Sequence, residues 1–187
     1  MCGRYSLTNT DYVKESYNLD VKPRYNIAPS QEILAVIDKP QMLKWCYSPS
    51  WAKKPMNLIN ARSETLKEKP SFREAKRCVI VADGWYEWKK EAQSKTPFYH
   101  HLNGQVFHFA GLYNSEGCLI VTTEACSKLS HVHHRMPVLL EDLEIRDWLG
   151  GKDVFASPLS NLIHTYPVTK YVNNPRNDDE NCSKELT

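Results

Sequence analysis

The chain has 187 residues, of which 41% are hydrophobic and 25% are charged, and its net charge is +2. This length and composition exclude a wholly disordered protein and predict one soluble domain over residues 1–187, expected to be monomeric. The longest apolar runs span only a few residues, so no membrane span is predicted. Because no secretory signal opens the chain, its six cysteines are expected to be reduced thiols in the cytoplasm.

Charge is unevenly distributed along the chain. Residues 1–140 contain 19 basic and 13 acidic side chains, whereas residues 141–187 contain 5 basic and 9 acidic ones. The basic part is therefore more basic than the net charge suggests, which permits an anionic partner on one side of the protein. A chance distribution of solvated charges is the alternative.

The local patterns, taken in chain order, predict several short strands and few helices. A helix is expected after the N-cap at Asn9 or Thr10, and a second over Glu141–Leu149 with Gly150 as its C-cap. The predicted strands are Ile33–Ile37, Met42–Trp45, Cys78–Ala82, Pro97–Leu102, Gln105–Ala110, Cys118–Thr122 and Val168–Val172.

Turn residues connect these strands. Asn103-Gly104 between two strand-like runs predicts a type I′ hairpin, because both turn positions require positive φ. Hairpin-linked strands with few helices predict an α+β domain built on antiparallel sheet. From about residue 173 the chain is polar and is expected to be irregular, with Cys182 exposed.

The position of Cys2 is the most informative feature of the sequence. A small second residue generally allows the initiator methionine to be removed, which would leave Cys2 with a free α-amine beside its thiol. Their ordinary pKa values, about 8 and about 8.5, keep a fraction of each nucleophilic at neutral pH. An aldehyde could form an imine with the amine, and the thiolate could then close a five-membered thiazolidine. By position alone, an ordinary terminal residue is the favoured interpretation of Cys2.

Glu87 lies within Gly84-Trp85-Tyr86-Glu87-Trp88. On a strand its side chain would share a face with Trp85, and a carboxyl group crowded by large rings has a raised pKa that suits proton transfer. A glutamate facing water on an edge strand is the alternative.

Three histidines gather in the run His131-Val132-His133-His134-Arg135-Met136-Pro137. The sequence has no CxxC pair and no second pair of ligands at standard spacing, so no metal is predicted. A general acid–base histidine beside an arginine is favoured over zinc. A polar surface loop is the alternative.

On a strand, the side chains of Asn60 and Arg62 would point the same way, and the guanidinium group of Arg62 is suited to binding a phosphate. A turn that involves Asn60 and Ser63 is the alternative. Trp45 and Trp51 would stack on unpaired bases if they are exposed, or pack in the core. The sequence contains no phosphate-binding loop, dinucleotide fingerprint, nucleophile elbow or metalloprotease motif, and no cofactor is predicted.

Eight short motifs, in order along nearly the whole chain, resemble those of the SRAP family, the SOS response-associated peptidases, which shield abasic sites in single-stranded DNA. The motifs are Met1–Tyr5, Arg24–Pro29, Trp45 to Ala52, Asn60–Glu64, Gly84–Trp88, Thr122–Ala125, His133–Pro137 and Val172–Asn174. One departure is Trp45-Cys46-Tyr47-Ser48-Pro49, where family members usually carry Trp-Gly-Leu-Ile-Pro.

The resemblance implies a compact α+β domain around an antiparallel, barrel-like sheet with a basic DNA groove. It also implies the chemistry. Cys2, after self-cleaving removal of Met1, would form a thiazolidine DNA–protein crosslink with the abasic aldehyde. Asn60 would position Cys2 and the sugar, and Glu87 and His133 would transfer protons. Because the imine acidifies the neighbouring carbon, β-elimination (AP-lyase activity) is an expected side reaction.

The same resemblance implies a set of DNA-binding residues, in which the arginines hold phosphates and the others shape the channel. This set is Arg4, Pro29, Trp45, Trp51, Arg62 and Arg135. The predicted partner is single-stranded DNA with abasic sites, met in the cytoplasm at the nucleoid.

Two other functions remain open from the sequence. One is an N-terminal-nucleophile amidohydrolase such as a glutamine amidotransferase, since those enzymes can also begin Met-Cys-Gly. The other is a non-catalytic single-strand DNA-binding module in which Cys2 plays no part. Crosslinking to abasic DNA, glutamine turnover and salt-sensitive binding without a covalent product distinguish the three functions.

Overall fold

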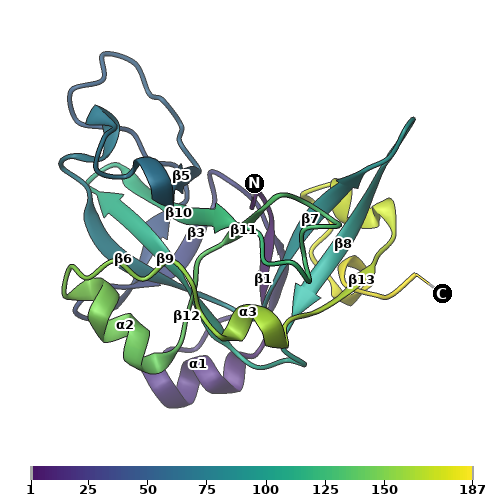
Figure 1. The fold of residues 1–187 in the computed structure, drawn as a ribbon. Helices are drawn as coiled ribbons and strands as arrows, with labels where there is room; N and C mark the ends of the chain where they lie inside the picture. The colour runs from purple at the N-terminus through teal and green to yellow at the C-terminus, as the bar shows by residue number, and fades with distance from the viewer. Residues whose placement is uncertain (1, 187) are drawn as a thin grey trace.

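The computed structural model describes residues 2–186 (Figure 1). Within this range the strands form two sheets, and most neighbours are antiparallel. The five-stranded sheet contains, in spatial order, β13 (His164–Pro167), β8 (Lys95–His101), β7 (Gly84–Lys90), β1 (Tyr5–Leu7) and β2 (Arg24–Ile27).

The second, eight-stranded sheet lies beside it. Its main path is β11 (Arg135–Pro137), β10 (Gly117–Glu124), β9 (Phe107–Asn114), β6 (Lys76–Ala82), β3 (Glu32–Val36) and β4 (Pro40–Lys44). Off this path, β12 (Leu139–Leu140) pairs with β9, and β5 (Asn60–Arg62) pairs in parallel with β10.

The helices are few and short, as expected for this class. They are α1 (Thr10–Tyr17), α2 (Asp142–Leu149), α3 (Leu159–Leu162) and the 3-10 turns η1 (Ser63–Thr65), η2 (Pro70–Phe72), η3 (Lys170–Asn173) and η4 (Glu180–Cys182). Asn9 caps α1 by accepting a hydrogen bond from Tyr12 N at 3.0 Å, which confirms one of the two predicted caps. No helix in the described part of the chain is long and apolar enough to cross a membrane.

The α+β class is confirmed, whereas the barrel-like core is not a closed barrel. Both sheets are open in strand order within the described residues. The larger sheet curls until Trp45, just after β4, forms a single bridge with Cys118 on β10. Rings from both sheets then fill the core, since Tyr5 lies 5.4 Å from Trp45 and 5.8 Å from Phe109 between ring centroids.

The turn at Asn103-Gly104 has the predicted backbone but does not make the predicted hairpin. Both residues have positive φ, 51° and 78°. The strands on either side join different sheets, because β8 pairs with β7 and β13 while β9 pairs with β6, β10 and β12. The turn therefore carries the chain from one sheet to the other.

The C-terminal segment also differs from its prediction. The strand expected at Val168–Val172 is replaced by β13 and η3. Beyond η3 the chain packs onto β2, where Asp178 Oδ1 accepts hydrogen bonds from Tyr25 N at 2.6 Å and Asn26 N at 2.9 Å. Cys182 is fully buried, so its expected exposure was wrong. All six cysteines are free thiols.

Candidate active site

Cys2 lies just before the first strand, β1, and is fully buried. β1 runs antiparallel to β7, with Tyr5 opposite Trp85, and Tyr86 N donates to Arg4 O at 2.9 Å. This pairing brings Cys2 toward the stretch of β7 that carries Glu87. Burial is the main reason that the pKa of the Cys2 thiol is raised well above its ordinary value, and the charge of Glu87 adds to it.

Glu87 is a buried carboxyl group, only 4% exposed. Trp85, two residues earlier on the same face of β7, packs against the rings of His100 and Phe107. Burial raises the pKa of Glu87 from 4.5 to about 7. A carboxyl group with such a pKa can both donate and accept a proton near neutral pH, as predicted from the sequence.

His133 comes just before β11 and faces the same pocket as Glu87. Its Nδ1 accepts a hydrogen bond from Arg135 N at 3.0 Å, and burial lowers its pKa. The pocket has a volume of about 480 Å³ and is lined by Glu87, Trp88, Lys95, His133 and Asn173. The fold thus brings the two predicted proton-transfer residues together.

Three of these lining residues had no assigned role in the sequence analysis. Trp88 was noted only as a neighbour of Glu87, and Asn173 only as part of a motif. Trp88 Nε1 donates to Asn173 Oδ1 at 2.8 Å, which fixes η3 against β7. Lys95, at the start of β8, was missed because its proximity to Glu87 depends on the register of the β7–β8 pair, where Glu87 lies opposite Phe98.

Asn60 and Arg62 lie on β5, beside the centre of β10. Asn60 is opposite Ile120 and Arg62 is opposite Thr122. The Nδ2 atom of Asn60 lies 3.4 Å from Ile120 O, while its Oδ1 is buried and has no hydrogen-bond partner among the described residues. Arg62 is exposed.

Arg135 lies on the opposite side of β10, within β11, and is only 8% exposed. Its guanidinium forms a two-pronged ion pair with Glu64, at 2.6 and 3.0 Å, and donates to Thr122 O at 2.7 Å. Arg135 is therefore engaged within the protein, whereas Arg62 is accessible to a phosphate.

The chain has clear relatives among known proteins. Residues 1–175 match the model of SRAP, the SOS response associated peptidase family. The chain belongs to the SRAP family. It is 38% identical to the abasic site processing protein YoqW of Bacillus subtilis over 95% of this chain and 96% of that protein. It is 33% identical to YedK of Escherichia coli, also an abasic site processing protein, over 95% and 96% of the two chains.

Solved structures show the same fold. A protein from Bacteroides thetaiotaomicron superposes with a TM-score of 0.74 over 97% of this chain and 92% of its own, at 22% identity. A phage-related protein from Bordetella bronchiseptica superposes with a TM-score of 0.68 over 89% and 94%, at 28% identity.

The side chain of Arg4 is held in place in this SRAP chain by a buried asparagine. Its Nη1 donates to Asn26 Oδ1 and to Val172 O, both at 2.8 Å. Asn26 Nδ2 in turn lies within 2.7–3.1 Å of three carbonyl oxygens. These belong to Val172, Asn174 and Asn177. The SRAP motifs around Arg4, Asn26 and Val172 therefore meet in one hydrogen-bonded cluster.

The two tryptophans assigned to DNA binding have different environments. Trp51 is 56% exposed and can stack on a base, and Pro29 is half-buried. Trp45 is fully buried and its Nε1 donates to Ile59 O at 2.9 Å, so its assignment to DNA contact was wrong. The departure from the SRAP pattern at Cys46-Tyr47-Ser48 serves packing, because Tyr47 is fully buried and its hydroxyl donates to Ser71 O.

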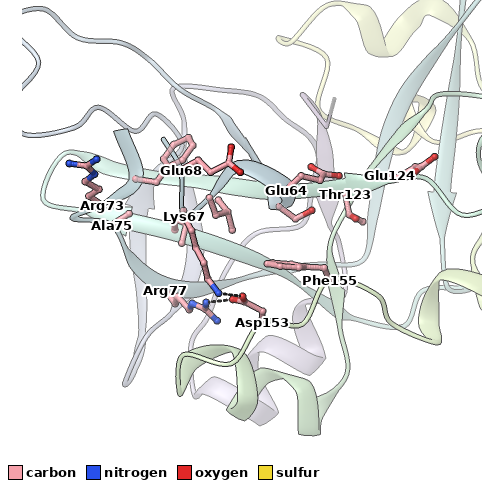
Figure 2. Close-up of a pocket in the computed structure, with 14 residues that line it drawn as sticks. Glu64, Lys67, Glu68, Arg73, Ala75, Arg77, Thr123, Glu124, Asp153 and Phe155 are labelled. Carbon is pink, nitrogen blue, oxygen red and sulfur yellow. Dashed lines mark hydrogen bonds and ion pairs between the residues drawn. The ribbon is translucent and has the colours of Figure 1, made fainter. Parts of the chain in front are cut away.

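A larger pocket, of about 830 Å³, lies elsewhere in this SRAP fold, between η1, η2 and the chain after α2 (Figure 2). Within it the side chains of Lys67 and Arg77 both pair with Asp153 at 2.6 Å. Neither Glu87 nor His133 lines it, whereas both line the smaller pocket. The smaller pocket is therefore the candidate reaction site.

Proposed function

We propose that this SRAP protein, once Met1 has been removed, uses Cys2 to form a covalent thiazolidine crosslink with abasic sites in single-stranded DNA and so shields them. The names of the YoqW and YedK relatives, as abasic site processing proteins, support the substrate. The observation that carries the proposal is the buried Glu87. Its pKa of about 7 and its place beside Cys2 and His133 suit proton transfer.

The crosslink forms in two steps. The α-amine of Cys2 adds to the aldehyde carbon of the ring-opened sugar, and loss of water leaves an imine. The sulfur of Cys2 then adds to the imine carbon, which closes the thiazolidine ring, while the nitrogen takes up a proton. Because burial keeps the thiol protonated, its proton leaves as the sulfur attacks, and Glu87 is the neighbouring acceptor.

The remaining residues of the site bind or orient the substrate. Asn60 has a buried Oδ1 without a partner among the described residues, and this atom suits an N–H donor such as the freed amine of Cys2. Arg62 is exposed and suits a phosphate. His133 serves the sugar hydroxyl. The same Glu87 would transfer protons in the hydrolysis that removes Met1, and the imine would allow slow β-elimination. The protein would act as a single domain and a monomer in the cytoplasm.

A denaturing gel tests the proposal directly. Protein whose Met1 has been removed, as verified by mass, is mixed with a single-stranded oligonucleotide carrying one abasic site. We expect a heat-resistant covalent band that Cys2→Ala abolishes. Cys2→Ala and Cys2→Ser both keep the amine without the thiol, so any imine that they form should become stable only after borohydride reduction. Cys126→Ala removes a thiol that the proposal does not use and should keep the band.

The other outcomes point to the other functions. If the Met1-free wild-type protein gives no covalent band, the proposal is wrong. Glutamine turnover in that case would indicate an amidohydrolase. Salt-sensitive binding without a covalent product would indicate a DNA-binding module.

A further inference from the structure

Glu64 lies in the turn η1, directly after β5, and has no part in the reaction proposed above. Its side chain is about half exposed and lines the larger pocket (Figure 2). Its carboxylate nevertheless reaches the guanidinium of Arg135 on β11. Two residues before Arg135, His133 lines the smaller pocket. The ion pair therefore connects the wall of the larger pocket to the candidate reaction site.

The guanidinium of Arg135 is buried and depends on two residues for its hydrogen bonds. Its Nη atoms donate to the two carboxylate oxygens of Glu64 at 2.6 and 3.0 Å, and Nη2 also donates to Thr122 O at 2.7 Å. Its Nε is buried and has no hydrogen-bond partner among the described residues. A two-pronged carboxylate pair fixes the orientation of a guanidinium as well as its position. Without Glu64, this buried cation would keep only Thr122 as a partner.

The backbone of Arg135 in turn orients the imidazole of His133. Arg135 N lies 3.0 Å from Nδ1 of the ring, and the ring stacks on that of His134, with 4.5 Å between their centroids. A movement of residue 135 would therefore turn the imidazole in its pocket. The pair with Glu64 limits such movement, because it ties β11 to a separate segment that lies beside β10.

Glu64 also determines how much positive charge lies near His133. Burial is the main cause of the lowered pKa of His133, and the charges of the amine at the start of the chain, of His134 and of Arg135 lower the pKa further. The other charged groups of its pocket are Glu87 and Lys95. The carboxylate of Glu64 offsets the charge of Arg135, so its removal would make the imidazole harder to protonate.

We infer that Glu64 is a positioning residue of the crosslinking reaction, which holds Arg135 so that His133 keeps the orientation and the surrounding charge that proton transfer requires. The inference rests on the proposed function, since it assigns Glu64 to the same reaction. Glu64 acts through Arg135 and not on the substrate, and it does so from a pocket outside the reaction site.

A titration of His133 without DNA tests the inference. The imidazole is followed by NMR against pH in Met1-free protein. Glu64→Gln removes the charge but keeps the size of the side chain, and we expect His133 to become protonated only at a lower pH than in the wild type. Glu64→Asp keeps the charge and should titrate close to the wild type. Glu68→Gln removes the same charge from an exposed residue of the same pocket that is not paired with Arg135, and should change nothing.

The rate of crosslinking gives a second measurement, on an oligonucleotide with one abasic site. At saturating DNA, Glu64→Gln should slow the reaction roughly 10-fold, because a displaced imidazole transfers protons less well than an oriented one. The DNA concentration that gives half of the maximal rate should stay the same. Glu64→Asp should recover part of the rate, and Glu68→Gln should match the wild type.

Three outcomes would overturn the inference. The first is an unshifted titration of His133 in Glu64→Gln. The second is an equal shift in Glu68→Gln, which would indicate a long-range effect of net charge. The third is a slower reaction that is explained entirely by weaker DNA binding. Melting temperatures confirm that each variant is folded under the assay conditions. If the wild-type protein forms no crosslink, the proposed function is wrong, whereas the titration still decides whether Glu64 acts on His133.

Discussion

The backbone amide of Arg135 donates a hydrogen bond to Nδ1 of His133 across 3.0 Å. The same nitrogen lies 3.3 Å from Arg135 O, to which it could only donate, and the shorter 3.0 Å contact favours the neutral imidazole with its proton on Nε2. Burial lowers the pKa of His133 and favours this neutral form. Because β11 holds Arg135 in place against β10, the backbone of Arg135 orients the imidazole ring.

This tautomer predicts different effects for two conservative variants. The amide nitrogen of glutamine can take the place of Nε2, whereas that of asparagine lies nearer to Nδ1. His133→Ala should slow crosslinking by roughly 100-fold, in the range typical of general acid–base groups. His133→Gln should retain clearly more of the rate than His133→Asn. Nitrogen-15 spectra of the imidazole, recorded without DNA, should show a protonated Nε2; a protonated Nδ1, or a faster Asn variant, would contradict the assignment.

The buried carboxyl group of Glu87 predicts a pH dependence of stability. Its pKa is about 7 in the folded protein against 4.5 ordinarily. Between these pH values the folded chain holds a proton that the unfolded chain has released, so stability falls as the pH rises through this window. One pKa unit corresponds to about 1.4 kcal/mol, which makes the loss on the order of 3 kcal/mol.

Glu87→Gln removes this titration and provides the measurement. Both proteins are unfolded with urea at pH 4.5 and at pH 8. The free energy of unfolding of the variant, relative to that of the wild type, should be higher at pH 8 than at pH 4.5 by roughly that amount. Its crosslinking rate should fall by about 100-fold or more, since an amide transfers no proton. An equal stability difference at both pH values would show that Glu87 titrates normally.

The sequence could predict elements whose causes are local. Asn9 caps α1 because its own side chain reaches the first turn, and Trp148 is buried because α2 is amphipathic. The sequence also predicted that Glu87 shares a face with Trp85, because side chains alternate along a strand. These predictions needed only neighbours within a few residues.

Predictions that depended on distant segments failed. The Asn103-Gly104 turn is locally that of a hairpin, but β8 and β9 have partners in separate sheets, and no local pattern encodes that choice. Cys182 lies in a polar stretch and yet is buried, because the segment is anchored to β2 through Asp178. Lys95 enters the site only through strand register.

Trp45 is buried and Trp51 is exposed, and this contrast gives a third prediction. Trp45→Ala should cost about 3–5 kcal/mol of stability, because it empties a fully buried site in the core. Trp51→Ala should leave the free energy of unfolding nearly unchanged. It should instead weaken single-strand binding by about 1–3 kcal/mol through the loss of base stacking. Urea unfolding and anisotropy on both variants make the comparison, and a stability loss in Trp51→Ala with unchanged binding would contradict it.

The cluster around Asn26 gives the last prediction. Asn26 is fully buried and joins Arg4, just before β1, to the carbonyls of η3 and the segment after it; the shortest of these contacts is to Asn177 O, at 2.7 Å. Asn26→Ala would leave the Arg4 guanidinium with one partner fewer and the carbonyl groups of Asn174 and Asn177 without this donor, while Val172 O would still accept from Arg4. Unsatisfied buried polar groups cost about 1–3 kcal/mol each, so we expect a loss of about 3 kcal/mol, reduced where a carbonyl finds water.

Asn161→Ala, at an exposed asparagine in α3, is the matched control and should change stability by less than about 0.5 kcal/mol. Because Arg4 follows Cys2 by two residues, Asn26→Ala should also slow crosslinking under conditions where the variant remains fully folded. A stability loss with an unchanged crosslinking rate would show that the cluster only anchors the C-terminal segment. A change below 1 kcal/mol in the free energy of unfolding would show that water replaces the amide without cost.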